Sequence, residues 1–301
     1  MSKILDSTSA GYSFALHVMQ SLGSYVGNLA LQGGMGIALA IDDSRKTGDI
    51  DMCASADAMA KLSLELPALA SKLFNKSPRL WTQCVDRDPE LHVHWGGQDR
   101  SRRLRVSWWA DDHAKSKEHV EFQFFEVDEE VLLQYPPQCI SVHDHFTRRP
   151  IKFWMRASYP ISALADKIVA IANSPRVRLI DYVDAIELLN TPQLDLFDVA
   201  RAIEAIMSAY TDESADAMLR KCLKIRPTID EIELQRQLCA IQDRVPHEKL
   251  IQIAGTVEQF NATRTRIVVH AIAIFAGAGY IHGGGPAMSA ASKPANSGLR
   301  M

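Results

Sequence analysis

The chain has 301 residues, of which 47% are hydrophobic, and its formal net charge at pH 7 is −3. This length suits one large domain or two ordinary ones, and the hydrophobic content is enough for a buried core. The near-neutral charge excludes a protein that binds nucleic acid or anionic membrane through overall electrostatic attraction. The 5 cysteines form no C-x-x-C pair, which argues against a zinc or redox motif and favours a reduced, cytoplasmic compartment.

The sequence predicts no association with a membrane. The N-terminal residues MSKILDSTSAGYS lack the apolar run of a secretory signal peptide. The most apolar stretch, residues 267–281, is shorter than the ~20 residues that span a bilayer, and it contains His270. We therefore expect a buried helix at this stretch.

The N-terminal part begins with helical periodicity. Apolar residues recur every three or four positions over residues 11–31, which predicts one helix that ends at Gly33 and Gly34. The following MGIALAI fits a short helix, and the loop DDSRKTG would return the chain into a strand that carries DIDM. Residues 56–75 again show a helical pattern.

The middle and the C-terminal part differ in texture. Four segments alternate apolar and polar residues, which is typical of antiparallel strands: residues 79–86, 90–96, 102–110 and 119–127. From residue 160 to about 281 the pattern is helical. We predict an α+β protein with a mixed α/β domain over residues 1–155, a helical domain over 156–282 and a disordered tail over 283–301.

Two aspartates stand at alternate positions of the predicted strand. Asp49 and Asp51 project from the same face of that strand, where their charges repel each other unless a cation lies between them. Carboxylate oxygens favour Mg²⁺ or Mn²⁺, and Mg²⁺ often binds one or two carboxylates together with substrate phosphates. The missing Cβ atoms of Gly33 and Gly34 would let backbone N–H groups approach a phosphate. The alternative is that D-x-D is a solvated turn at the end of a strand.

The segment GGMGIALAIDDSRKTGDIDM, in which R-x-T leads into the aspartate pair, resembles the first motif of the AbiEii/AbiGii toxin-like nucleotidyltransferases of the polymerase-beta-like superfamily. Three later segments resemble further motifs of the family in its order, over roughly residues 20 to 190. They are HVEFQFFEV with Glu121, ALADKIVAI with Lys167 and Ala170, and RLIDYVD with Arg178, Asp181 and Asp184.

Two positions depart from the family pattern. Glu121 stands where the third carboxylate is usually Asp, and the longer side chain still reaches a metal. Ile180 stands where the last motif usually has a lysine, so a phosphate-binding charge is missing there, and Arg176 or Arg178 is a candidate to replace it.

The resemblance implies a polymerase-beta-like nucleotidyltransferase domain with a mixed or antiparallel sheet, followed by a helical domain. Three carboxylates, Asp49, Asp51 and Glu121, would hold two ions of Mg²⁺ or Mn²⁺, and Glu121 would help deprotonate the acceptor hydroxyl. Lys167 would reach the triphosphate, and Asp181 with Asp184 would orient Lys167 or an arginine. The residues implied in nucleotide binding are Gly33, Gly34, Arg45, Thr47, Lys167 and Arg178.

Each of these assignments has a simpler structural alternative. Glu121 would then be a solvent-facing strand residue, Lys167 a lysine that extends from a helix flank, and Asp181 a helix cap. Arg45 and Thr47 would only shape their loop. A basic cluster of Arg100, Arg102, Arg103 and Arg105 would either contact an RNA acceptor or form a solvated hairpin.

The predicted function is Mg²⁺-dependent transfer of a nucleotidyl group from an NTP to an acceptor hydroxyl. The resemblance further implies the toxin of a bacterial toxin–antitoxin or phage-defence pair, with tRNA as acceptor and a separately encoded antitoxin as partner. Three alternatives stay open: transfer to a small molecule such as an aminoglycoside, a non-catalytic module for nucleotide sensing or protein binding, and a metal-dependent phosphoesterase.

Overall fold

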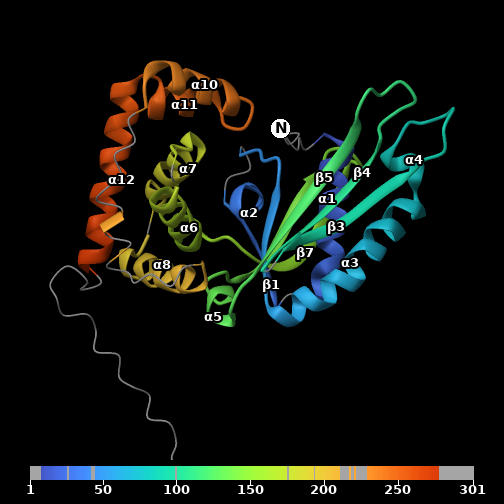
Figure 1. Cartoon of the computed structure of the whole chain (residues 1–301), viewed down its shortest axis with the longest axis horizontal. Coiled ribbons are helices and arrows are strands. Elements are labelled where there is room, and N and C mark those ends of the chain that lie inside the picture. Colours follow the sequence, from blue (N-terminus) through green and yellow to red (C-terminus); the bar gives the residue numbers. More distant parts are fainter. Residues whose placement is uncertain are drawn as a thin grey trace, which may run out of the picture.

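The computed structural model describes residues 8–277 except residues 26, 42–44, 99, 175, 193, 211–216, 218–219 and 222–228. The tail predicted over 283–301 lies outside the described residues. Figure 1 shows the α+β architecture that the sequence predicts, a mixed sheet followed along the chain by helices. The predicted fold class is confirmed.

A single 7-stranded sheet, in the order β3-β4-β5-β2-β1-β7-β6, forms the centre of the first half of the chain. Its strands are β1 Leu29–Gln32, β2 Ile50–Ala54, β3 Leu91–Gln98, β4 Ser101–Trp109, β5 Lys117–Glu126, β6 Pro137–Asp144 and β7 Arg149–Ala157. The pairs β1–β7 and β2–β5 are parallel, and the other neighbours are antiparallel. The short strands β1 and β2 therefore lie in the middle, between longer strands on either side.

The helix predicted over residues 11–31 is wrong in its second part. Helix α1 spans Ala10–Ser21 and begins at Ser9, whose hydroxyl accepts the N–H of Tyr12 at 3.1 Å. Residues Leu29–Gln32 are β1, and all four are buried. A central strand that is covered on both faces has an apolar run without alternation, so the periodicity of the sequence did not separate it from a helix.

The glycine pair begins a helix and does not end one. Helix α2, Gly33–Ala40, starts directly after β1, and Gly33 has a left-handed backbone with φ 63°. A Cβ atom on Gly33 would lie 2.4 Å from Asp51 Oδ2, and one on Gly34 would lie 2.7 Å from Thr47 Oγ1. Both positions therefore require glycine because the chain carrying the aspartates passes so close to them.

The strand predictions are confirmed for three segments and wrong for one. Residues 90–96, 102–110 and 119–127 coincide with β3, β4 and β5. Residues 79–86 form the end of the short helix α4, Pro78–Trp81, and a loop, because proline at the first helical position favours a helical turn. The strands β6 and β7 were not singled out in the sequence, although Ile151, Phe153 and Met155 alternate as buried residues along β7.

Helices make up the described part of the chain after β7. The predicted helix over 56–75 is confirmed as α3, Ala56–Lys76. In the predicted helical region from residue 160 onward, the last helical segment is divided into α11 and α12, which meet at a bend. The later helices are α6 Pro160–Asn173, α7 Leu179–Leu189, α8 Leu196–Tyr210, α10 Glu231–Ile241, α11 His247–Ala254 and α12 Val257–Gly277, with α5 Glu129–Leu132 between β5 and β6.

Two hydrophobic cores lie on opposite faces of the sheet. The first contains Phe14 and Trp108 and joins α1 and α3 to one face. The second contains Leu164, Val183 and Phe260 and joins α6 to the helices that follow, which gather on the other side in Figure 1. The change from sheet to helices falls between β7 and α6, near the predicted boundary at residue 155, and the division into two domains stays a prediction.

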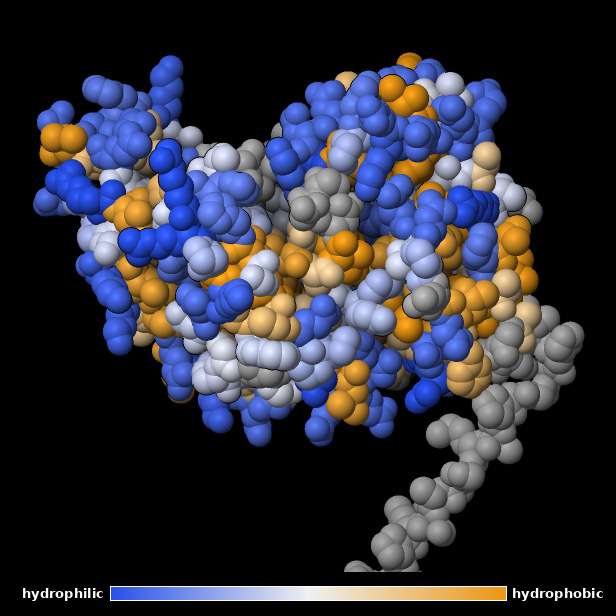
Figure 2. All heavy atoms as spheres, turned by 180° about the vertical axis from the view of Figure 1, so that it is seen from behind, coloured by the Kyte–Doolittle hydropathy of each residue, from blue (hydrophilic) through white to orange (hydrophobic). Residues whose placement is uncertain are grey.

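The surface seen from behind is hollowed between the sheet part and the helical part, and hydrophilic side chains border the hollow (Figure 2). Across the described ranges, no helix has both the length and the apolar character needed to cross a bilayer. Helix α12, which contains most of the apolar stretch from residue 267, packs Ile267, Ile274 and Phe275 into the second core instead.

Candidate active site

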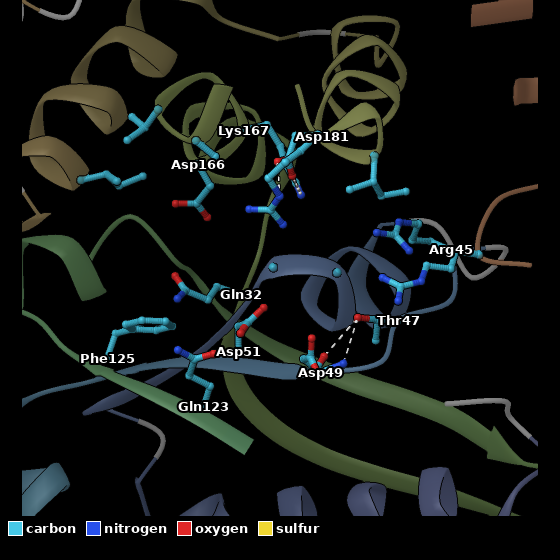
Figure 3. Close-up of a pocket in the computed structure, with 18 residues that line it drawn as sticks. Gln32, Arg45, Thr47, Asp49, Asp51, Gln123, Phe125, Asp166, Lys167 and Asp181 are labelled. Carbon is cyan, nitrogen blue, oxygen red and sulfur yellow. Dashed lines mark hydrogen bonds and ion pairs between the residues drawn. The ribbon is translucent and has the colours of Figure 1, made fainter. Parts of the chain in front are cut away.

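A pocket of about 430 Å³ lies where the middle of the sheet meets α6 and α7 (Figure 3). This volume is within the range of small-molecule sites. It brings together all predicted site residues except Glu121 and Asp184, from segments far apart in the sequence. Those lining residues are Gly33, Gly34, Arg45, Thr47, Asp49, Asp51, Lys167, Arg178 and Asp181.

The N-terminus of α2 opens into this pocket. Its cap position, Gln32, makes no side-chain hydrogen bond to the first turn, so the N–H groups that begin with Gly33 and Gly34 are left for another acceptor. The N-terminus of a helix carries partial positive charge and binds anions such as phosphate. The geometry therefore suits the phosphate contact predicted for the glycine pair.

Asp49 and Asp51 lie at the start of β2, with Asp51 in the strand and Asp49 directly before it. Asp51 pairs with Gln32 of β1 on one side and with Gln123 of β5 on the other. Burial, and then the negative charge of Asp49, raise the pKa of Asp51 to about 6. At Asp51, the nearby cations therefore do not offset burial and the repulsion from Asp49.

Lys167 is held in a buried network of opposite charges. Its Nζ lies 2.9 Å from Asp181 Oδ1 and 2.9 Å from Asp184 Oδ2. Burial lowers the pKa of this ammonium, but the two carboxylates raise it well above its usual value. Lys167 is therefore a fixed positive charge at the pocket wall, and not a lysine that extends from a helix flank.

Arg45 and Thr47 support the chain that leads to the aspartates. Arg45 Nε donates to Asp184 Oδ1 at 2.9 Å, and the arginine is buried. The Thr47 hydroxyl donates to the Asp49 carbonyl at 3.1 Å, and the Asp49 N–H points back to that hydroxyl at 3.5 Å. Both residues shape the loop and also line the pocket.

Further positive charge comes from two arginines. Arg178 Nε lies 3.2 Å from Asp181 Oδ2, while most of the arginine side chain stays exposed at the pocket rim. Arg244 was not found by sequence reasoning, since it lies far from the motifs, and its buried Nε has no hydrogen-bond partner in the described part of the chain. Ile180 lines the same pocket, so Arg178 and Arg244 lie where the family lysine is missing; Arg176 is not among the lining residues.

Glu121 is the predicted metal ligand that the structure does not bring into the pocket. It projects from the same face of β5 as Gln123, but its carboxylate accepts from Arg105 Nε at 2.8 Å and from Arg105 Nη2 at 2.5 Å, and Arg103 Nη1 lies 3.6 Å away. Nowhere in the described residues do three or more His, Cys, Asp or Glu side chains form a group that could hold a metal ion. The predicted three-carboxylate set is thus not assembled in this conformation.

A different carboxylate lines the pocket instead. Asp166 lies next to Lys167 on α6. Its carboxylate accepts a hydrogen bond from the hydroxyl of the fully buried Tyr135, which lies 3.0 Å from Oδ1 and 2.9 Å from Oδ2. Burial raises the pKa of Asp166 to about 7, and the charge of Asp51 adds to the rise. In Figure 3 its carboxylate points into the space above Asp51. Sequence reasoning missed Asp166 because only the tertiary contact with Tyr135 distinguishes it from a solvated helix residue.

The residues present fit a divalent cation bound together with phosphate. Asp49 and Asp51 supply hard oxygen donors, which is the ligand chemistry of Mg²⁺ and Mn²⁺. Burial and mutual repulsion, which raise the pKa of Asp51, would both be relieved by a bound cation. Two protein carboxylates are a sufficient contribution when the remaining ligands are phosphate oxygens and water.

Comparison with solved structures finds distant similarities of fold. JHP933 from Helicobacter pylori has 11% identity and a TM-score of 0.46, with 90% of this chain and 93% of that chain covered. A putative nucleotidyltransferase from H. pylori has 12% identity and a TM-score of 0.44, with 90% and 96% covered. MenT4, the nucleotidyltransferase toxin Rv2826c from Mycobacterium tuberculosis H37Rv, has 12% identity and a TM-score of 0.47, with 88% and 95% covered.

No curated protein matches the sequence at a significant level. The family comparison is more informative: residues 18–262 match the family described as "Nucleotidyl transferase AbiEii toxin, Type IV TA system". This match covers most of the chain and includes the glycine pair, both aspartates, Lys167 and Asp181. The chain belongs to the AbiEii family of nucleotidyltransferase toxins.

Proposed function

We propose that the protein transfers a nucleotidyl group from an NTP to the hydroxyl of an acceptor, with Mg²⁺ or Mn²⁺ as cofactor and tRNA as acceptor. The observation that carries the proposal is the pocket itself. In it, the aspartate pair faces the N-terminus of α2, which begins with glycine, and several cationic side chains. The pKa of Asp51 is raised there to about 6. Family membership supports the reaction class.

The cationic wall of the pocket would bind the triphosphate. Lys167 supplies a fixed positive charge, Arg178 adds a second positive charge at the rim, and Arg244 Nε is a buried donor without a hydrogen-bond partner in the described part of the chain. The N–H groups at Gly33 and Gly34 add the partial charge of a helix N-terminus. Because Asp181 and Asp184 hold Lys167 in place, little entropy is lost when a phosphate binds to it.

Asp49 and Asp51 would hold the divalent cation, which when bound neutralises charge on the phosphates and on the leaving pyrophosphate. The acceptor oxygen forms a bond to the α-phosphorus while the bond from that phosphorus to the bridging oxygen breaks. The proton of the attacking hydroxyl passes to a base in the pocket other than the carboxylates that hold the cation. The further metal role predicted for Glu121 stays a prediction.

The test is incubation of the protein with each α-³²P-labelled NTP, total tRNA and Mg²⁺, followed by acid precipitation. We expect label to enter acid-insoluble RNA with the wild type and not with Asp49→Asn. The exposed Asp88→Asn is the matched control and should behave like the wild type. Label that stays acid-soluble with wild type and Asp49→Asn alike would contradict catalysis on RNA.

Two further arms separate the alternative reactions. A parallel reaction with aminoglycosides, resolved by thin-layer chromatography, tests small-molecule transfer. Mass measurement of the RNA distinguishes lengthening by a nucleotide from degradation by a phosphoesterase. The absence of labelled product in every arm, together with intact RNA, would favour a non-catalytic nucleotide-binding module.

We also propose a cognate antitoxin protein as partner, on the basis of the family description. Induced expression of the wild type in a bacterial host should stop growth, whereas Asp49→Asn should not. Co-expression with the product of an adjacent gene should restore growth if that product is the antitoxin. Equal growth with wild type and Asp49→Asn would contradict a toxic enzymatic activity.

A further inference from the structure

The pocket has two halves of different chemistry, with the aspartate pair between them. One half carries the positive charges already described. The other half contains two amides, an aromatic ring, a carboxylate and apolar helix residues, namely Gln32, Gln123, Phe125, Asp166, Val169, Ala170 and Ile206. Figure 3 shows Gln32, Gln123, Phe125 and Asp166 grouped on the side away from Arg45 and Thr47.

The second half does not suit a phosphate. Within the described part of the chain, no Lys or Arg lies at ion-pair distance from Asp166, and this carboxylate would repel a phosphate whenever it is ionised. An aromatic ring with neutral amides and a carboxylate is instead suited to a nucleoside: the ring packs on the base, and the polar groups bind N–H, amino or hydroxyl groups at its edge.

The polar groups of this half are held in place by buried partners. The Cys53 thiol donates to Gln32 Oε1 at 2.8 Å, and the Tyr135 hydroxyl lies 3.2 Å from the same oxygen, so the Gln32 amide NH₂ is turned away from both. Tyr135 also fixes the carboxylate of Asp166. Pre-positioned groups lose little freedom on binding, which favours selective recognition.

We propose that Gln32, Phe125 and Asp166 form the subsite for the nucleoside of the NTP, with Tyr135 as the residue that positions Gln32 and Asp166. The inference rests on the proposed function, because it places the triphosphate in the cationic half. With the α-phosphate above Asp51, the nucleoside bonded to it extends into the other half. This subsite then determines which NTP is selected.

The test compares ligands that share the phosphates but differ in the nucleoside. Isothermal titration calorimetry with Mg²⁺ measures the binding of ATP, GTP, CTP, UTP and inorganic tripolyphosphate to the full chain. We expect the wild type to bind at least one NTP about tenfold or more tightly than tripolyphosphate, which is the contribution of base stacking on an aromatic ring. Equal affinities for tripolyphosphate and all four NTPs would overturn the proposal.

Phe125→Ala should weaken binding of the preferred NTP about tenfold and leave tripolyphosphate binding unchanged. Arg178→Ala, the matched variant in the cationic half, should weaken the binding of both the NTP and tripolyphosphate. Retained tripolyphosphate binding also shows that Phe125→Ala still folds, and Phe125→Leu provides a milder substitution that keeps the apolar contact. Asp166→Asn and Tyr135→Phe should change the order of preference among the four NTPs more than they change tripolyphosphate affinity.

If folded Phe125→Ala lost affinity for the NTP and for tripolyphosphate to the same extent, the division of the pocket into a phosphate half and a nucleoside half would be wrong. If Phe125→Ala left every NTP affinity unchanged and only raised the KM for the acceptor, the half would bind the terminal nucleoside of the acceptor and the proposal would be wrong. NTP binding that depends on Phe125 without any labelled product in the transfer assay would contradict the transferase and leave the nucleoside subsite standing.

Discussion

Two groups of carboxylates in and beside the pocket differ in how their charge is neutralised. Asp181 and Asp184 bind Lys167, and Asp184 also binds Arg45; although burial alone would raise the pKa of Asp184, these cations hold it below its usual range. Asp51, by contrast, has its pKa raised to about 6. Across the described residues, no Lys or Arg lies at ion-pair distance from Asp51.

The difference separates a supporting role from a binding role. Carboxylates that are already neutralised by the protein hold Lys167 in position and have little charge left for a ligand. Carboxylates that the protein leaves without an ion pair carry a cost in stability, and a cation supplied with the substrate would remove that cost. Removal of a charge from the first group should therefore lower stability, whereas removal of the charge of Asp51 should lower activity and raise stability.

Removal of the charge of Asp51 should have the largest effect. Asp51→Asn is expected to reduce nucleotidyl transfer by about 10³-fold or more, as for other residues on which the chemical step depends. Its fold should persist, because asparagine has nearly the same shape and no charge to bury. Steady-state kinetics with labelled NTP measure the rate, and a loss below tenfold would place the reacting atoms elsewhere.

Removal of the central cation should lower stability in addition to weakening triphosphate binding. Lys167→Met leaves Asp181 and Asp184 without their shared partner and should lower the free energy of unfolding by about 3 kcal/mol. Urea unfolding at pH 7 measures the change. The exposed Lys61→Met is the matched control and should change stability by less than about 0.5 kcal/mol; equal effects of the two substitutions would contradict the buried network.

The two groups should respond to pH in opposite directions. The pKa of Asp51 is raised to about 6, so between pH 4 and 6 the folded protein retains a proton that the unfolded chain has lost, and ionisation of Asp51 lowers stability as the pH rises. Asp51→Asn should therefore raise the free energy of unfolding by about 2 kcal/mol at pH 8 and by nearly nothing at pH 4.

The pKa of Asp184 is lowered, so its ionised form contributes stability that is present above its unfolded pKa and lost as the pH falls. Asp184→Asn should thus destabilise the protein at pH 8, with a smaller effect at acid pH. Urea titrations of both variants without divalent cations provide the comparison. Destabilisation by Asp51→Asn at pH 8 would contradict the opposite signs.

Glu121 should show the smallest effect on stability. Its partners Arg103 and Arg105 have side chains that are 56% and 58% exposed, and ion pairs of this kind contribute less than about 1 kcal/mol. Glu121→Gln should therefore change the free energy of unfolding by less than that amount. The metal role predicted from the sequence additionally requires a loss of transfer comparable to that of Asp51→Asn, and an unchanged rate would exclude it.

The parts of the site that follow from local sequence were predictable. Asp51 lies on a strand and Lys167 on a helix, as the motifs implied, and the glycine pair lies beside the aspartates. The start of α2 was not predictable, because the apolar residues Leu29, Ala30 and Leu31 of the buried strand β1 suit a buried helix equally well.

Tertiary pairing accounts for the residues that sequence reasoning placed wrongly or missed. Glu121 lies on a strand as predicted, but its binding to Arg105 depends on the register between β4 and β5. Asp166 acquires its orientation from Tyr135, which is 31 positions away, and Arg244 reaches the pocket from the loop after α10. No local pattern encodes such contacts.

The most direct test of a cation site at the aspartate pair is the binding of Mn²⁺, followed through the electron paramagnetic resonance signal of the free ion. In the presence of a non-hydrolysable NTP analogue, the wild type should remove Mn²⁺ from solution in proportion to protein concentration, beyond the amount bound by the analogue alone. Asp51→Asn should lose this binding, whereas Asp184→Asn should retain it. Mn²⁺ binding by Asp51→Asn as tight as that of the wild type would contradict the assignment of the cation to Asp49 and Asp51.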